Sequence, residues 1–97
     1  MILEVAILNV REGMCEDFES AFRQASPIIA SMPGYVSHEM RPCLENPQSY
    51  VLLVHRQKLQ DHTIGFRQSP EYQQWRQHLH HFYEPFPTVE HYGPSLI

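Results

Sequence analysis

Histidine is the residue type best suited to chemistry in this 97-residue chain, which contains seven histidines. They are His38, His55, His62, His78, His80, His81 and His91. An unperturbed imidazole titrates at about pH 6.5, so a histidine that faces a pocket can accept or return a proton at neutral pH. The sequence has no GxGxxG, Walker loop, HExxH, GxSxG or CxxC motif. Any chemistry must therefore depend on a pocket that the fold assembles.

His62 is the strongest candidate for an acid–base role. It precedes Phe66 by four residues in a segment expected to be helical, so the two side chains share a face. We expect Phe66, Tyr72 and Trp75 on the side that meets the sheet, where an imidazole beside aromatic rings can act as a base on a planar ligand. The alternatives are a His62 hydrogen-bonded to backbone at a helix start, and aromatic rings that only fill the core.

The helix predicted after residue 69 carries further candidates. His78 borders its apolar side and could contact a substrate. Arg76 is either a solvated surface charge or a group that holds a phenolate or carboxylate. A metal site could use His78 with His81, three residues apart, and would need a third ligand such as His62 or Glu84. Because this spacing matches no known metal motif, we expect no bound metal.

The elements that must position these residues follow the order βαββαβ. Strands are expected over residues 2–10, 35–44, 50–56 and 88–92. Helices are expected over residues 18–32 and 70–82, with a shorter helical segment at 59–66. This order predicts an α+β ferredoxin-like sandwich, in which one antiparallel sheet has both helices on a single face.

Proline and glycine positions refine the two predicted helices. Pro27 lies inside the first helix and should kink it, whereas Pro33-Gly34 should end it. Ser69 is expected to cap the second helix, with Pro70 as its first residue.

The face of the predicted sheet opposite the helices is unusually apolar. Leu3, Val5 and Ile7 alternate onto that face, and the central strand is apolar throughout residues 50–54. Soluble monomers rarely expose a large apolar patch, and a chain this short buries only about 60 to 65% of its unfolded surface. We therefore expect a homodimer that packs sheet against sheet. The alternative is that short apolar runs arise by chance in a small core.

Composition and charge exclude several classes of protein. A hydrophobic fraction of 42% with 19% charged residues excludes a disordered chain. Seven basic residues, never clustered, against eleven acidic ones give a net charge of −4, so nucleic acid and anionic membranes are not expected partners. With no spanning apolar run, no signal-like N-terminus and two isolated cysteines, Cys15 and Cys43, we expect one cytoplasmic domain with reduced thiols.

Five segments carry a family resemblance. They are the opening strand MILEVAILNV, the turn REG, the helix ending in SMPGY, the strand YVLLVHR and the segment LQDHTIGFRQSPEYQQW. Together they make the chain, from Ile2 to about Tyr92, resemble the antibiotic biosynthesis monooxygenase domain family. The resemblance implies a single domain over residues 1–97 and a dimeric α+β barrel of two ferredoxin-like subunits, each with a small pocket between helices and sheet.

The resemblance also implies a chemistry. Members of this family oxidise polyketide phenols or quinols with molecular oxygen and without metal or flavin, whereas others degrade haem. In the quinone-forming members the pocket uses an Asn, a Trp, a Tyr and an Arg, whose positions fall on Leu52, Arg56, His62 and Arg76 of this chain. Only the arginine is retained. This puts a polyketide substrate in doubt, while His62 could take over proton handling.

The haem-degrading members provide a second comparison. Their Asn, Trp and haem-ligating His fall on Ala6, Phe66 and Arg76. None of the three is retained, so haem oxygenation is not expected.

We therefore expect a homodimeric, cofactor-independent monooxygenase or quinol oxidase that acts on a small aromatic substrate with oxygen. The expected site comprises His62 as base, Arg76 as anion stabiliser, and Leu52, Phe66, Tyr72, Trp75 and His78 around the substrate. The alternative is a non-catalytic dimeric module of the same fold that binds a small ligand, for example in a stress response.

Overall fold

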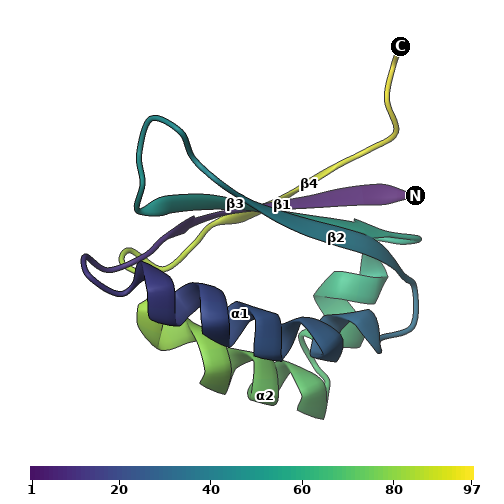
Figure 1. Cartoon of the computed structure of the whole chain (residues 1–97). Helices are drawn as coiled ribbons and strands as arrows, with labels where there is room; N and C mark the ends of the chain where they lie inside the picture. The colour runs from purple at the N-terminus through teal and green to yellow at the C-terminus, as the bar shows by residue number, and fades with distance from the viewer.

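Four strands and two α-helices follow one another in the predicted order (Figure 1). The computed structural model describes all 97 residues. The elements are β1 (Ile2–Asn9), α1 (Cys15–Ala30), β2 (Tyr35–Pro42), β3 (Ser49–Arg56), η1 (Asp61–Phe66), α2 (Pro70–Leu79), η2 (His80–Phe82) and β4 (Val89–Tyr92). The fold is therefore the α+β ferredoxin-like sandwich that the sequence predicts.

The four strands form one antiparallel sheet in the order β2-β3-β1-β4. In the centre, Ala6 lies opposite Leu52 and Glu4 lies opposite Val54. Figure 1 shows α1 and α2 side by side beneath one face of this sheet, with no element over the other face. Alternate residues of β1 and β3 consequently point either into the space under the helices or onto the open face.

The core fills the space between the sheet and the helices. From α1, Phe18, Phe22, Ala25 and Ile29 are buried at helical spacing. Phe22 meets Trp75 of α2 edge to face, with ring centroids 5.6 Å apart. These contacts confirm the periodic pattern that predicts the first helix.

The helix boundaries follow local signals, with some differences from the predictions. Ser69 caps α2, since its Oγ accepts a hydrogen bond of 3.2 Å from the Tyr72 N–H, and Pro70 is the first helical residue, as predicted. The second helix ends at Leu79, and the remaining three predicted residues form the separate 3-10 turn η2. The first helix extends from Cys15 to Ala30, starting three residues before Phe18.

The segment between β3 and α2 has an unusual geometry. Instead of an ordinary helix over residues 59–66, it forms the short π-helix η1, in which the Arg67 N–H donates a 3.1 Å hydrogen bond to the carbonyl of His62. Such wide turns occur frequently at functional sites. The predicted last strand begins one residue later, at Val89.

The predicted cellular location depends in part on the state of the cysteines and on whether a helix could span a membrane. Cys15 and Cys43 are free thiols. Neither α-helix combines the length and the apolarity that crossing a bilayer requires.

Candidate functional site

A cavity lies under the helix-covered face of the sheet, beside η1. Its volume is about 70 Å³ and 11 of its 16 lining residues are hydrophobic. A single water molecule needs about 10–15 Å³ of such space, so the cavity has room for several waters or a small organic molecule. Its walls come from β1, α1, β3, η1, α2, the segment leading into β4 and the start of β4 itself.

Five of the residues predicted for the site line this cavity together: Leu52, His62, Phe66, Tyr72 and Trp75. Phe66 packs edge to face on Tyr72, with centroids 5.3 Å apart, and on Trp75 at 5.9 Å. Phe66 and Trp75 also belong to the buried core. These aromatic rings therefore both fill the core and line the cavity. The two interpretations of them, as core and as pocket wall, are compatible.

Arg76 and His78 lie elsewhere. Both are exposed on α2, and neither lines the cavity. The buried stripe of α2 runs between Trp75 and Leu79. At 100° per residue, Arg76 and His78 are each turned about 80° from the centre of that stripe, on opposite sides. The structure therefore keeps both side chains away from a ligand held in the cavity of the same chain.

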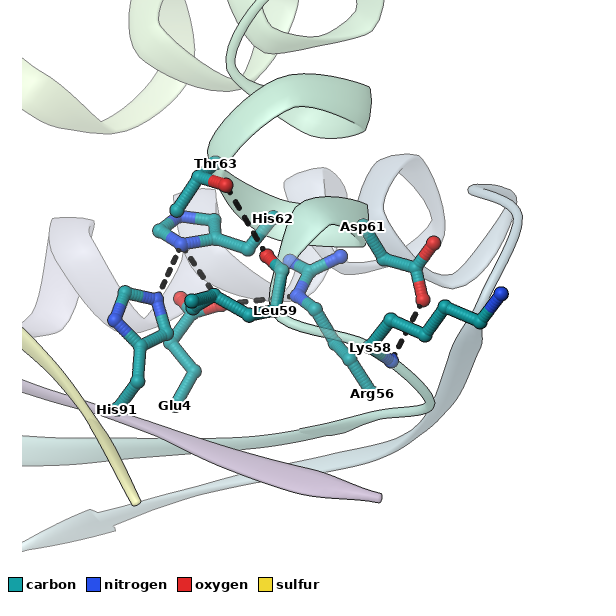
Figure 2. Close-up of polar contacts among 8 residues, drawn as sticks. All are labelled: Glu4, Arg56, Lys58, Leu59, Asp61, His62, Thr63 and His91. Atoms are coloured by element: carbon teal, nitrogen blue, oxygen red, sulfur yellow. Dashed lines mark hydrogen bonds and ion pairs between the residues drawn. The ribbon is translucent and has the colours of Figure 1, made fainter. Parts of the chain in front are cut away.

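Four polar side chains meet in one place (Figure 2), and three of them, Glu4, Arg56 and His62, line the cavity. This polar cluster consists of Glu4 from β1, Arg56 from β3, His62 from η1 and His91 from β4. The Arg56 Nε–H donates a 2.9 Å hydrogen bond to Glu4 Oε1. His62 Nδ1 lies 2.8 Å from His91 Nε2 and 3.6 Å from Glu4 Oε1. Glu4, Arg56 and His62 are only 5%, 1% and 4% exposed, whereas His91 is half-buried.

Arg56 has one hydrogen-bond donor to spare. Its Nη1 is buried and has no partner, although the guanidinium also lies 5.3 Å from the centre of the Phe66 ring. Buried polar groups nearly always have a partner, which can be an ordered water or an acceptor from a ligand. Because the group is cationic, an anionic oxygen is the acceptor that it favours most.

His62 is electrically neutral in this setting. Burial, followed by the charges of Arg56, Arg67 and then His91, lowers the pKa of His62 to about 3. Its Nδ1 faces His91 and Glu4, whereas its other nitrogen, Nε2, points away from both (Figure 2). A neutral ring whose Nδ1 carries the proton leaves a lone pair on Nε2. His62 lines the cavity, so that lone pair is the available proton acceptor.

Sequence reasoning did not single out three members of the polar cluster. Glu4 interrupts the inward, apolar positions of the first strand, and Arg56 is in phase with the inward residues Leu52 and Val54 of the third. Opposite charges at inward positions of two strands could therefore have identified Glu4 and Arg56 from the sequence. The contact of His91 with this cluster could not be predicted from the sequence, because it depends on the register between β1 and β4, which places His91 directly opposite Glu4.

Comparison with known sequences identifies relatives along most of the chain. The antibiotic biosynthesis monooxygenase family model matches residues 1–78. The uncharacterized protein YczJ of Bacillus subtilis is 53% identical over 92 residues, which cover 95% of this chain and 97% of that protein. A 42.8 kDa protein in the whiE locus of Streptomyces coelicolor is 35% identical over 48 residues, which cover 50% of this chain and 12% of that protein.

Solved structures show the same architecture. A Bordetella bronchiseptica protein named for the same family is 32% identical and superposes with a TM-score of 0.94, covering 98% of this chain and 97% of that chain. A mutant of SnoaB, a cofactor-independent oxygenase from Streptomyces nogalater, superposes with a TM-score of 0.79 at 18% identity, covering 99% of this chain and 94% of that chain. The second likeness concerns the fold alone.

Proposed function

Because the chain belongs to the antibiotic biosynthesis monooxygenase family, we propose that it oxidises a small phenol or quinol with molecular oxygen in the cavity under its sheet. The observation that carries this proposal is the pairing of two complementary groups in one cavity. With the proton on Nδ1, His62 has a lone pair on Nε2 for the substrate proton, and Arg56 lines the same cavity with an unpaired Nη1–H group and a charge that favours the anion.

The chemistry requires a substrate that can itself reduce oxygen. A base removes the phenolic proton, and the phenolate then transfers one electron to O2, giving a phenoxyl radical and superoxide. Recombination of this pair forms a carbon–oxygen bond, and loss of water from the hydroperoxide yields a quinone. For a quinol, transfer of two electrons and two protons to O2 yields the quinone and hydrogen peroxide. The protein needs to supply only a base, an anion stabiliser and a cavity that excludes water.

Arg56 has the position that this mechanism requires of a cation. The sequence assigned this role to Arg76, which is exposed outside the cavity. Arg56 is 1% exposed and lines the cavity. Its charge favours the phenolate over the phenol, and the same charge, after burial, contributes to lowering the pKa of His62 to about 3. We therefore assign anion stabilisation to Arg56 and proton acceptance to His62.

The cavity also restricts the size of the substrate. A volume of about 70 Å³ corresponds to a few water molecules. A single ring with small substituents is the natural guest for such a space, and a polycyclic substrate would require the walls to move. The aromatic faces of Phe66, Tyr72 and Trp75 are suited to packing against a planar ring.

We also propose that the protein is a homodimer formed through the open face of the sheet. On that face Val5 lies opposite Leu53 and Ile7 lies opposite Val51, and Ile7 is 48% exposed. No element of the chain covers these side chains (Figure 1). Burying them against a second copy would remove a continuous apolar patch from water.

Oxygen uptake with a panel of substituted hydroquinones tests the proposed activity. The protein is first treated with a chelator, so that adventitious metal does not oxidise the substrate. We expect uptake that depends on protein concentration and forms the quinone, followed by its absorbance. If hydroquinones bind and no oxygen is consumed, the proposed oxidation is wrong. The alternative, a non-catalytic module that binds a small ligand, is then favoured.

A further inference from the structure

Three side chains of the polar cluster are metal-ligating types brought together from distant parts of the chain. Glu4, His62 and His91 come from β1, η1 and β4, and their ligand atoms all lie within 4.8 Å of one another. Figure 2 shows Glu4 and His91 both directed at the same edge of the His62 ring. Nothing in the proposed oxidation requires a second histidine at this place.

Two of the three separations between the ligand atoms suit a common metal ion. Metal–nitrogen and metal–oxygen bonds of about 2.0–2.2 Å, at angles of about 90–109°, place ligand atoms about 2.8–3.6 Å apart. His62 Nδ1 lies 2.8 Å from His91 Nε2 and 3.6 Å from Glu4 Oε1. The third separation, between His91 Nε2 and the Glu4 carboxylate, is within 4.8 Å, so these two side chains must move toward each other to hold a common ion.

The hydrogen bonds of the polar cluster leave ligand lone pairs available. The two imidazoles share one short hydrogen bond, so at least one of the facing nitrogens carries a lone pair. Arg56 bonds only Oε1 of Glu4, which leaves Oε2 free of the guanidinium. Arg56 adds a positive charge that opposes a cation. Its unpaired Nη1, however, is placed to bond an anionic molecule bound beside the ion.

We propose that Glu4, His62 and His91 form a site for one divalent transition-metal ion at the wall of the cavity. Two imidazoles and one carboxylate are a ligand set that suits Zn²⁺, Fe²⁺ and Co²⁺. Glu4 and His62 also line the cavity, so the ion would lie at its wall.

This site goes beyond the proposed oxidation and has a consequence for it. A neutral imidazole has one lone pair, so coordination through Nδ1 of His62 fixes the proton on Nε2. His62 then has no acceptor for the substrate proton. Metal occupancy and the metal-free oxidation therefore exclude each other, and a bound metal ion would inhibit that reaction.

Titration of the metal-stripped protein with Co²⁺, followed by its visible absorption and by competition with Zn²⁺, tests the site. We expect one ion per chain, with an absorption spectrum that reports nitrogen and oxygen ligands. His91→Gln removes a half-buried ligand. We expect this substitution to weaken Co²⁺ binding by at least about 10- to 100-fold. Loss of a residue that only supports a metal ligand already has an effect of that size. Glu4→Gln should weaken binding in the same way.

The matched control is His81→Gln, which removes an exposed histidine of η2. It should leave affinity and stoichiometry unchanged. It also disables the alternative surface pair of His78 with His81. The proposal is overturned if His91→Gln binds Co²⁺ as tightly as the unmodified chain, or if His81→Gln abolishes binding. Circular dichroism and the melting temperature establish that each variant is folded.

Failure of the metal site and failure of the proposed function give different results. Oxygen uptake in chelator, without any Co²⁺ binding, would reject the metal site and retain the oxidation. Stoichiometric Co²⁺ binding that His91→Gln abolishes would establish the metal site, whatever the outcome with hydroquinones.

Discussion

At the scale of single residues, the buried pair of Glu4 and Arg56 connects stability with the site. Removing one partner leaves the other as an uncompensated buried charge, which typically costs about 3–5 kcal/mol. We expect Arg56→Met to lower the free energy of unfolding by about this amount. The double variant Arg56→Met/Glu4→Gln should lose less than the sum of the two single changes, because neither charge then remains. Urea unfolding measures all three.

The control for this prediction is the exposed ion pair of Arg41 and Glu39, whose side chains are 3.1 Å apart. Neutralising that pair should change stability far less, since solvent screens exposed charges. Equal losses for the two pairs would show that burial of Glu4 and Arg56 does not matter energetically.

His62 carries the prediction for activity. If Nε2 accepts the substrate proton, His62→Ala should lower kcat for hydroquinone oxidation by about 10²- to 10⁴-fold, the usual contribution of a positioned base. The dimer and the affinity for the substrate should change little. His81→Ala, an exposed histidine outside the cavity, is the matched control. Unchanged turnover in His62→Ala would remove His62 from the mechanism.

At the scale of elements, the start of η1 depends on a close approach of two chain segments. Gly34 has φ +83°, and a Cβ added there would overlap the Asp61 carboxylate. Asp61 in turn accepts a 2.9 Å hydrogen bond from the Lys58 N–H just before η1. Gly34 therefore allows the turn after α1 to pack against the element that holds His62.

Two alanine substitutions separate backbone strain from this steric contact. Gly13 has φ +80° and nothing within 4 Å of an added Cβ, so Gly13→Ala incurs only the cost of the left-handed conformation, about 1–2 kcal/mol. Gly34→Ala should destabilise the chain by more, and it should also reduce hydroquinone turnover because η1 must shift. Equal melting temperatures for the two variants would contradict this role of Gly34.

The elements also show what the sequence can predict. Periodicity and proline placement identified both helices and the cap at Ser69, because those signals lie within a few neighbouring residues. The π-helical geometry of η1 was not predictable. Nor was the place of His91, which depends on how β4 pairs with β1. Arg56 could have been found from its inward position in β3. Arg76 lies on the exposed side of α2, which agrees with the alternative of a solvated surface charge.

At the scale of the whole molecule, the open sheet face predicts association. Ile7→Lys combined with Leu53→Lys places two charges on the centre of that face, and we expect the proposed dimer to dissociate into folded monomers. Leu44→Lys is the matched control, since Leu44 is 91% exposed in the turn between β2 and β3. Light scattering coupled to gel filtration measures the mass. A dimer that persists in the double variant would place the interface elsewhere.

The histidines make stability depend on pH. Burial lowers the pKa of His38, His62 and His80, reinforced by Arg56 for the first two and by Arg76 for the third. The unfolded chain has ordinary histidine pKa values of about 6.5. Below that pH it therefore binds protons that the folded chain does not bind. Stability is complete above about pH 6.5 and is lost as the pH falls below it.

Denaturant unfolding between about pH 7.5 and 5, in the presence of chelator, measures this loss. One excess proton corresponds to about 1.4 kcal/mol per pH unit. His38→Asn should flatten the profile, because it removes one of the three titrating groups. A stability that is constant, or that rises toward the acid end of this range, would show that the folded chain accepts these protons.

The spare donor of Arg56 has a consequence for selectivity before any reaction begins. Folding buries Nη1 without a hydrogen-bond acceptor from the protein itself. A ligand that presents an oxygen to Nη1 supplies the missing acceptor. A hydrocarbon ring of equal shape leaves the Nη1–H group unpaired. If the proposed oxidation takes place in this cavity, we expect hydroxylated arenes to bind more tightly than unsubstituted ones, by about 1–3 kcal/mol.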